Sequence, residues 1–472
     1  MTAAAAGATG LGLSRRKLLL PLALAQFICS FAGSNMNVMI NDISRDLDTD
    51  VQGVQAAITL FLLIMAILMI PCSKLTDRWG RKRCFQWGLL LYGIGAILSA
   101  VSPGLGILIL GNSIFEGVGT ALLIPPVYIL ATLAFSDLTA RARAFGVISG
   151  MGGIGAAAGP LIGGLITTAI SWRAAFVFQA LVILVILVLG RSLVDPLEPD
   201  PTRPFDLMGA ILSAVGLFFL VFGILQADSN PTLLAIFMGI GVVFLAAFFV
   251  YIRRRERAGK EVLLSTGLFR NRLSNLALVT QNVQWLILMG TSFTVAVFLQ
   301  TVRGYNAIQT GLIFTAATLG ILVSSLAAER LAKRRAQKTL IIGGFVVTLA
   351  GIVVLLLLVH ASTKVLAFGP GLLLIGLGLG LMLTPSVNVV QSSFPESLQG
   401  EISGLSRSVS NLGSTFGTAI AGTILVSDLA SGTRSYGFAM LSLAIAGLIG
   451  LGAALFLPKS PPLPEATSPQ TG

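Results

Sequence analysis

The chain has 472 residues, of which 55% are apolar and only 11% are charged. A soluble globular protein carries about 25% charged residues, so this composition cannot cover a water-facing surface. The net charge of +12 suggests a nucleic-acid partner in a soluble protein. In an apolar chain the same excess marks membrane topology, so we expect an integral membrane protein that binds no nucleic acid.

Apolar runs of about 20 residues, the length that crosses a bilayer, recur along the whole chain. They predict an all-α protein with fourteen transmembrane helices. Because this number is even, both termini lie on the same side of the membrane. The runs cover residues 18–40, 53–73, 84–101, 105–133, 142–168, 174–191, 207–226, 232–252, 274–300, 308–328, 338–359, 365–390, 402–426 and 436–457.

The basic residues indicate which side the termini face. Lys and Arg concentrate in cytoplasmic loops. Nearly all of the 31 Lys and Arg residues fall in segments on the terminus side, and Arg407 is counted among them. We therefore predict cytoplasmic termini in the cell (cytoplasmic) membrane. The residues on the opposite side are Arg45, Arg173, Arg303, Lys364 and Arg434.

Histidine and cysteine are too sparse for most site chemistry. The chain has one histidine, His360, and three widely spaced cysteines. These counts exclude a multi-histidine metal site and most histidine-based catalysis, and they suggest no disulfide framework. We expect no catalytic residues, no metal and no cofactor.

Two motifs recur at an offset of eight helices. The acid–Arg pair Asp77-Arg78 follows the second run, and Glu329-Arg330 follows the tenth. The glycine pattern of the fifth run returns, less complete, in the thirteenth. Two six-helix halves with two extra helices between them explain the offset, and such duplicated halves are typical of secondary transporters. The predicted parts are residues 1–17 (cytoplasmic), 18–191 (first bundle), 207–252 (inserted helices), 274–457 (second bundle) and 458–472 (disordered tail).

At these residues the chain resembles the major facilitator superfamily, and within it the fourteen-helix drug:proton antiporter branch. The loop after the second run is similar to the signature G-x-L-A-D-R-x-G-R-K, with Ser73 in place of the leading glycine. The fifth run contains the antiporter signature G-x3-G-P-x2-G-G complete. Its residues are Gly155, Gly159, Pro160, Gly163 and Gly164.

The resemblance implies that the acid–Arg cluster is a latch that holds the cytoplasmic side shut in the outward-facing state. A carboxylate there can accept charge-assisted hydrogen bonds or meet the positive N-terminus of a helix from the other half. The alternative is a solvated ion-pair cluster that only sets topology. The latch residues are Asp77, Arg78, Gly80, Arg81, Glu329 and Arg330.

In the fifth helix, glycines four residues apart allow close backbone approach, and Pro160 can bend the helix. We expect this helix to rock against its neighbour during transport; the alternative is close packing alone.

Polar residues at membrane depth are the candidates for substrate contact. We expect no Arg or Lys in the cavity, which favours a neutral or weakly cationic amphipathic molecule. For each candidate the alternative is a side chain that only bonds a neighbouring helix. The candidates are Gln26, Ser30, Asn37, Asn112, Thr120, Gln281, Gln284, Trp285, Asn388 and Gln391.

Glu116 is the one ionisable residue deep in a predicted helix, and we predict that it is the proton-coupling residue. The antiporter branch usually has Asp in the first helix and Arg in the fourth, where this chain has Ala32 and Ser113. These departures argue against proton coupling by the usual route. The alternative is a permanently protonated Glu116 that hydrogen-bonds Asn112 or a backbone carbonyl.

The leading hypothesis is a monomeric secondary transporter that exports hydrophobic or amphipathic small molecules, in contact with membrane lipids and with protons as the candidate coupling ion. A second hypothesis is a lipid or lipid-like carrier without the usual proton coupling. A third is a transport-dead sensor or a membrane enzyme, which no catalytic constellation supports.

Overall fold

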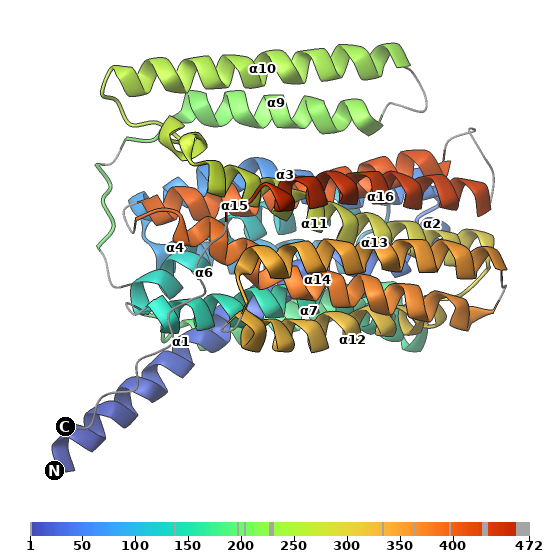
Figure 1. The fold of residues 1–472 in the computed structure, drawn as a ribbon, viewed down its shortest axis with the longest axis horizontal. Helices are drawn as coiled ribbons and strands as arrows, with labels where there is room; N and C mark the ends of the chain where they lie inside the picture. Colours follow the sequence, from blue (N-terminus) through green and yellow to red (C-terminus); the bar gives the residue numbers. More distant parts are fainter. Residues whose placement is uncertain are drawn as a thin grey trace.

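In the computed structural model, every secondary-structure element among the described residues is a helix, and the long helices run side by side along one direction (Figure 1). The predicted tail, apart from Pro458, lies outside the described residues. The structure describes residues 2–458 apart from 136–137, 196–197, 203, 226–230, 333–334, 362–363, 396–397 and 427–432.

The long helices follow one another in the order of the apolar runs. Those before residue 200 are α1 (Thr2–Asn35), α3 (Val51–Trp79), α4 (Arg81–Ala100), α6 (Gly117–Ala134), α7 (Leu138–Ala169) and α8 (Trp172–Gly190). The next two are α9 (Leu207–Leu225) and α10 (Pro231–Arg257). The last are α11 (Arg272–Val297), α12 (Ala307–Ala332), α13 (Gln337–Ala361), α14 (Phe368–Ser392), α15 (Gln399–Val426) and α16 (Thr433–Leu455).

Short elements extend or join these helices. Two are π-helical: η2 (Ile109–Glu116) continues α5 (Leu105–Leu108) into α6, and η4 (Phe298–Val302) continues α11. The others are η1 (Met36–Val38), α2 (Ile40–Asp46), η3 (Thr266–Arg270) and η5 (Val365–Ala367).

Twelve helices among the described residues are long and apolar enough to cross a membrane. The helices α4 and α15 are not among these twelve, since α4 begins with three basic residues and α15 is rich in serine. Both still pack within the bundle: α4 lies against α6 and α8, and α15 lies against α3 and α11. The prediction of a multi-pass helical membrane protein is therefore confirmed.

The first and last groups of helices repeat a packing pattern. The pair α1–α7 corresponds to the pair α11–α15, and the two groups meet through α3 against α15 and through α7 against α12. The helices that carry the recurring motifs therefore lie at this contact between the groups.

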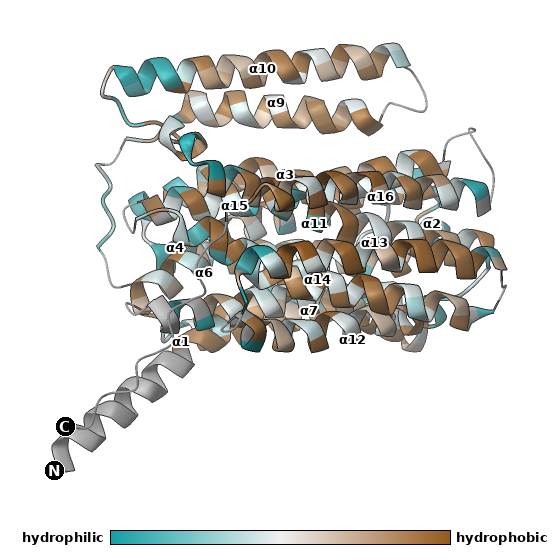
Figure 2. Cartoon of the chain, in the orientation of Figure 1, coloured by the Kyte–Doolittle hydropathy of each residue, from teal (hydrophilic) through white to brown (hydrophobic). Residues whose placement is uncertain are grey.

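The helices α9 and α10 form a hairpin beside the main bundle (Figure 1). A Cβ on Gly241 would fall 2.8 Å from the backbone nitrogen of Leu220, so glycine permits their close approach. The hairpin contacts the bundle through α9, which packs on α3 and α15. Figure 2 shows hydrophobic residues along the length of both helices and hydrophilic residues at the end of α10, as expected for helices facing lipid.

Candidate functional site

A small cavity lies where α1, α3, α6, α11 and α15 meet. Its volume is about 30 Å³, room for roughly two water molecules. Three of the predicted substrate-contact residues line it: Gln26 and Ser30 from α1 and Trp285 from α11. A drug-sized ligand occupies a pocket of about 300–1,000 Å³, so the cavity must expand before it can hold one.

The helix α15 supplies the polar side chains of the lining that the sequence interpretation missed. The expectation that no Arg or Lys reaches the cavity is wrong, because Arg407 lines it and is only 4% exposed. The guanidinium carbon of Arg407 lies 4.7 Å from the ring centre of Tyr128 on α6. The spacing of three and four residues places the contributors on one helix face. They are Arg407, Ser410, Asn411 and Ser414.

Gln26 is held by a short polar chain at the cavity wall. Its Nε2 donates to the Oγ of Ser30 at 3.1 Å, and the hydroxyl of Tyr128 donates to its Oε1 at 3.2 Å. The same Tyr128 ring lies under the guanidinium of Arg407. This arrangement fixes a polar patch on one side of the cavity. The thioethers of Met65, Met69 and Met289 line it as well, and they can repack around differently shaped molecules.

Several predicted residues bond other helices or turns without lining the cavity. The side-chain oxygens of Gln281, Gln284 and Gln391 accept hydrogen bonds from serines 406, 386 and 403 at 2.9, 2.8 and 3.1 Å. The side chain of Asn388 is half-buried. A role for these residues in substrate contact stays a prediction.

Glu116 ends the π-helical segment η2 and is fully buried. Its Oε1 accepts a hydrogen bond from the Oγ of Ser99 on α4 at 3.4 Å, while Oε2 has no hydrogen-bond partner among the described residues. Its neighbours on the helix, Asn112 and Thr120, are also buried, and none of the three lines the cavity. The sequence did not predict the π-helical turn, a rare form that recurs at functional sites.

The two positions that depart from the antiporter pattern are both buried. Ser113 donates to the carbonyl of Ala57 on α3 at 2.8 Å, and Ala32 is 3% exposed. At these two positions the chain has a helix-to-helix hydrogen bond and a methyl group in place of ionisable side chains.

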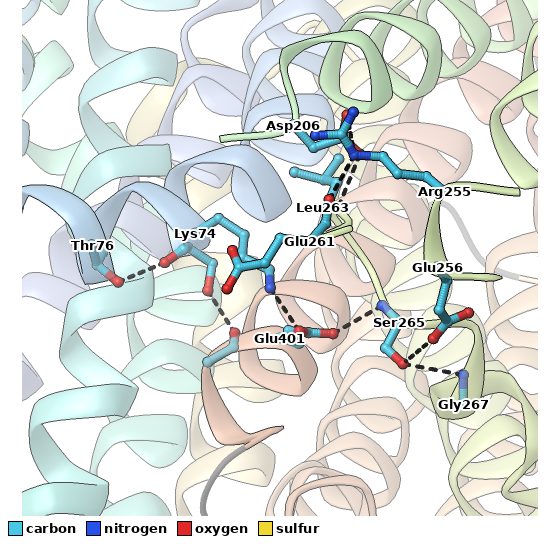
Figure 3. Close-up of polar contacts among 12 residues, drawn as sticks. Lys74, Thr76, Asp206, Arg255, Glu256, Glu261, Leu263, Ser265, Gly267 and Glu401 are labelled. Carbon is cyan, nitrogen blue, oxygen red and sulfur yellow. Dashed lines mark hydrogen bonds and ion pairs between the residues drawn. The ribbon is translucent and has the colours of Figure 1, made fainter. Parts of the chain in front are cut away.

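At the end of the bundle where α3 ends and α15 begins, an ion pair joins the two groups of helices. The Nζ of Lys74 on α3 lies 2.6 Å from the Oε1 of Glu401 on α15. The other carboxylate oxygen of Glu401 accepts from the backbone N–H of Ser265, in the segment after α10 (Figure 3). Beside this pair, the hydroxyl of Ser73 donates to the carbonyl of Gly400 at 2.6 Å. Three segments far apart in the sequence therefore meet at Glu401.

The predicted latch residues lie next to this ion pair. Asp77 accepts a hydrogen bond from the guanidinium of Arg81 at 2.5 Å. A Cβ on Gly400 would lie 3.8 Å from the carboxylate of Asp77, so this carboxylate lies at the N-terminus of α15. The backbone N–H of Arg81 donates to Asp195 at 2.6 Å.

The remaining latch residues differ in their surroundings. Gly80 has a φ of +91°, which links α3 to α4 in a conformation that favours glycine. Arg78 and Arg330 are exposed. The side chain of Glu329 lies outside the described part of the structure.

The α9–α10 hairpin is anchored at this same end by Asp206, which is 5% exposed. Its carboxylate accepts from the N–H of Gly209, from the hydroxyl of Tyr251 and from the N–H of Leu263, at 3.0–3.1 Å. Arg255 adds a charge 3.9 Å away (Figure 3). The hairpin and the segment that reaches Glu401 are thus held together.

Hydrogen bonds join the two groups of helices at the opposite end as well. The amide of Asn37 donates to the hydroxyl of Ser292 at 3.0 Å, and the amide of Gln300 donates to the carbonyl of Asn37 at 2.7 Å. Asn41 in α2 donates to the carbonyl of Gln300 at 3.1 Å. Contacts between the two groups of helices are therefore present toward both ends of the bundle at the same time.

The glycines of the antiporter signature lie at helix contacts. A Cβ on Gly155 would meet the carbonyl oxygen of Phe27, and a Cβ on Gly163 would lie 3.2 Å from that of Asn35, both on α1. A Cβ on Gly164 would instead meet the carbonyl oxygen of Ala307 on α12. These glycines let α7 pack directly on backbone from both groups of helices.

Comparison with known proteins agrees with this arrangement. The sequence profile of the Major Facilitator Superfamily matches residues 22–418. The puromycin resistance protein pur8 of Streptomyces alboniger is 29% identical over 88% of this chain and 82% of its own length. The multidrug efflux pump LfrA of Mycolicibacterium smegmatis is 29% identical over 78% and 72% of the two chains. A probable actinorhodin transporter of Streptomyces coelicolor is 28% identical over 84% and 70%.

These matches also confirm the prediction of a transporter and not an enzyme. The chain belongs to the Major Facilitator Superfamily.

Proposed function

We propose that this protein exports hydrophobic or amphipathic small molecules by alternating access through the cavity between α1, α3, α11 and α15. The observation that carries the proposal is a cavity lined from both groups of helices, which make separate contacts with each other toward its two ends. Opening one set of contacts while the other holds would expose the cavity to one side only. Relatives named as multidrug efflux and antibiotic transport proteins support the export of amphipathic molecules.

The proposed topology has fourteen spans, which adds α4 and α15 to the twelve apolar helices. Residues 18–191 and 274–457 form the two six-helix bundles, residues 207–252 form the inserted pair, and the termini face the cytoplasm. This is the plan of the fourteen-helix drug:proton antiporter branch, and the proposed location is the cytoplasmic membrane. We take the monomer to be the transporting unit, since the cavity is built within one chain.

Glu116 is the proposed coupling residue, although it lies inside the first group of helices and not at the cavity wall. Ionising a lone carboxyl at this depth costs a few kcal/mol, about 3 on insertion scales. Changes in the packing of η2 against α4 would therefore favour uptake or release of its proton. Ser99 on α4 donates a hydrogen bond to Glu116 at the end of η2. A change in the protonation of Glu116 would therefore alter the contact between these two helices.

Transport in everted membrane vesicles tests the proposal. Wild-type vesicles should accumulate amphipathic dyes, and Gly33→Leu should abolish accumulation because its side chain fills the cavity beside Leu62. Gly239→Leu is the matched control, since nothing lies within 4 Å of its added Cβ on α10. Equal dye accumulation in Gly33→Leu and wild-type vesicles would contradict transport through this cavity.

A further inference from the structure

The cavity wall carries hydrogen-bond donors that have no acceptor among the residues that the structure describes. In this part of the chain, two nitrogens of the Arg407 guanidinium, Nε and Nη2, are buried without a hydrogen-bond partner. The amide nitrogen of Asn411 and the indole nitrogen of Trp285 are in the same condition. All three side chains line the cavity, so donors from α11 and α15 converge on one small space.

The charge of Arg407 is not balanced nearby. Among the described residues, no carboxylate lies within 4.0 Å of its guanidinium, and no acidic residue lines the cavity. The Tyr128 ring, 4.7 Å from the guanidinium carbon, contributes a cation–π contact but accepts none of these N–H groups. A buried charge without a counter-charge is costly, and ionisable residues at membrane depth mark functional sites.

We propose that Arg407, Asn411 and Trp285 form a binding site for an anionic oxygen group of the transported molecule. This inference rests on the proposed export function and narrows its substrate class to amphipathic acids, such as carboxylates. The planar guanidinium donates two parallel hydrogen bonds to a carboxylate, which the amide and indole N–H groups complete. The methionines of the cavity contact the apolar body of the same molecule.

The proposed site favours an anionic substrate, whereas the sequence alone favoured a neutral or weakly cationic one. Neutral and weakly cationic amphipaths leave the donors of this wall unmatched, and a cation is repelled by Arg407. An acid satisfies both the charge and the donors. The anionic group can belong to a soluble amphipath or to a lipid headgroup, which the experiment separates.

Three dansyl compounds that differ in charge test the site. Dansylglycine is an anion at pH 7.4, dansylamide is neutral and dansylcadaverine is a cation. Their binding is measured by fluorescence polarisation with the purified full-length protein in nanodiscs of phosphatidylcholine, a lipid without net charge. We expect wild-type protein to bind dansylglycine most tightly. Arg407→Gln should weaken dansylglycine binding by about tenfold or more and leave binding of the other two compounds nearly unchanged, because one charge-assisted contact is lost.

Two further variants distinguish the loss of a specific contact from a general folding defect. Trp285→Phe removes only the indole donor and should weaken dansylglycine binding several-fold. Arg303→Gln is the matched control, because Arg303 also lies over an aromatic ring, that of Phe298, at 5.4 Å but does not line the cavity. It should bind all three compounds as the wild type does. Competition of dansylglycine by phosphatidylglycerol, lost in Arg407→Gln, would assign the anion to a lipid headgroup; no competition would assign it to soluble acids.

The inference is overturned if Arg407→Gln weakens all three compounds equally, which would make Arg407 a packing anchor. It is also overturned if wild type prefers the cation or binds none of the three. Failure of the export function is a separate result: no dye enters everted vesicles, while Arg407-dependent binding of dansylglycine persists.

Discussion

Lys74 on α3 and Glu401 at the start of α15 hold these ends of the two helices together, with 2.6 Å between Nζ and Oε1. The two side chains are 22% and 15% exposed, so water screens their attraction only in part. Since Glu401 also receives the N–H of Ser265, the segment after α10 lies on the contact that must break when this end opens.

Removal of this ion pair should favour opening toward the cytoplasm. Glu401→Gln keeps the shape of the side chain and should cost the closed end about 1 kcal/mol, a roughly fivefold shift in the ratio of closed to open protein. The rate at which a cysteine at position 410 reacts with a membrane-impermeant thiol reagent from the cytoplasmic side measures this ratio. The exposed Glu198→Gln serves as control, and an unchanged rate in Glu401→Gln would show that the pair does not hold the end shut.

Removal of the ionisable group at position 116 should abolish proton-coupled transport without abolishing the exchange of substrate across the membrane. Glu116→Gln keeps much of the hydrogen bonding with Ser99 but cannot release a proton. The variant should lose accumulation driven by a pH gradient and still exchange substrate at equilibrium in proteoliposomes. Full gradient-driven accumulation by Glu116→Gln would exclude Glu116 as the coupling residue and favour an uncoupled carrier.

The contact between α7 and α1 should tolerate no side chain at the signature glycines. A Cβ at Gly159 would collide with the hydroxyl of Ser34 and the backbone of Asn35, so Gly159→Leu should lower the free energy of unfolding by at least 1–3 kcal/mol, about the cost of overpacking. Gly150→Leu on the same helix meets nothing within 4 Å and is the control. Thermal unfolding in detergent compares the two; equal midpoints would contradict the close contact.

The outer end of the molecule should weaken in acid. The hydrogen bond from Arg173 holds the pKa of Asp46 below its ordinary value, with a smaller contribution from the hydrogen bond of Trp172. A lowered pKa in the folded state means that the stabilisation is present above about pH 4, the ordinary pKa of Asp, and is lost as pH falls through the folded-state value. Melting temperatures between pH 7 and pH 3 should therefore fall less in Asp46→Asn than in wild type. Asp48→Asn, an exposed change two residues away, should fall as the wild type does.

The sequence predicted the helices and the glycine contacts because both are local patterns. The spacing of Gly155, Gly159 and Gly163 predicts that the backbone of another helix packs closely against them. In the structure this helix is α1. From the sequence, Arg407 was assigned to a cytoplasmic segment because serines interrupt the apolar pattern at the start of α15. In the structure, Arg407 is the ninth residue of this helix and is buried. The spacing of Arg407, Asn411 and Ser414 on one helix face was the signal that could have placed it.

Contacts between distant segments could not be predicted from the sequence. The hydrogen bond from the N–H of Ser265 to Glu401 joins the segment after the inserted hairpin to α15. No sequence pattern relates these two distant positions. The hydrogen bond from Asn37 to Ser292 likewise depends on how the two groups of helices dock, and a role for Asn37 in substrate contact stays a prediction.

Alternating access is tested most directly by distances at the two ends in the same protein. Spin labels at positions 78 and 331 report the cytoplasmic end, and labels at positions 170 and 302 report the outer end; all four residues are exposed, whereas the native cysteines are buried. On addition of a dye that everted vesicles accumulate, we predict opposite changes in the two distances, and Asp77→Asn should shift the population toward the state open to the cytoplasm. Two distances that stay fixed, or that widen together, would contradict transport by alternating access.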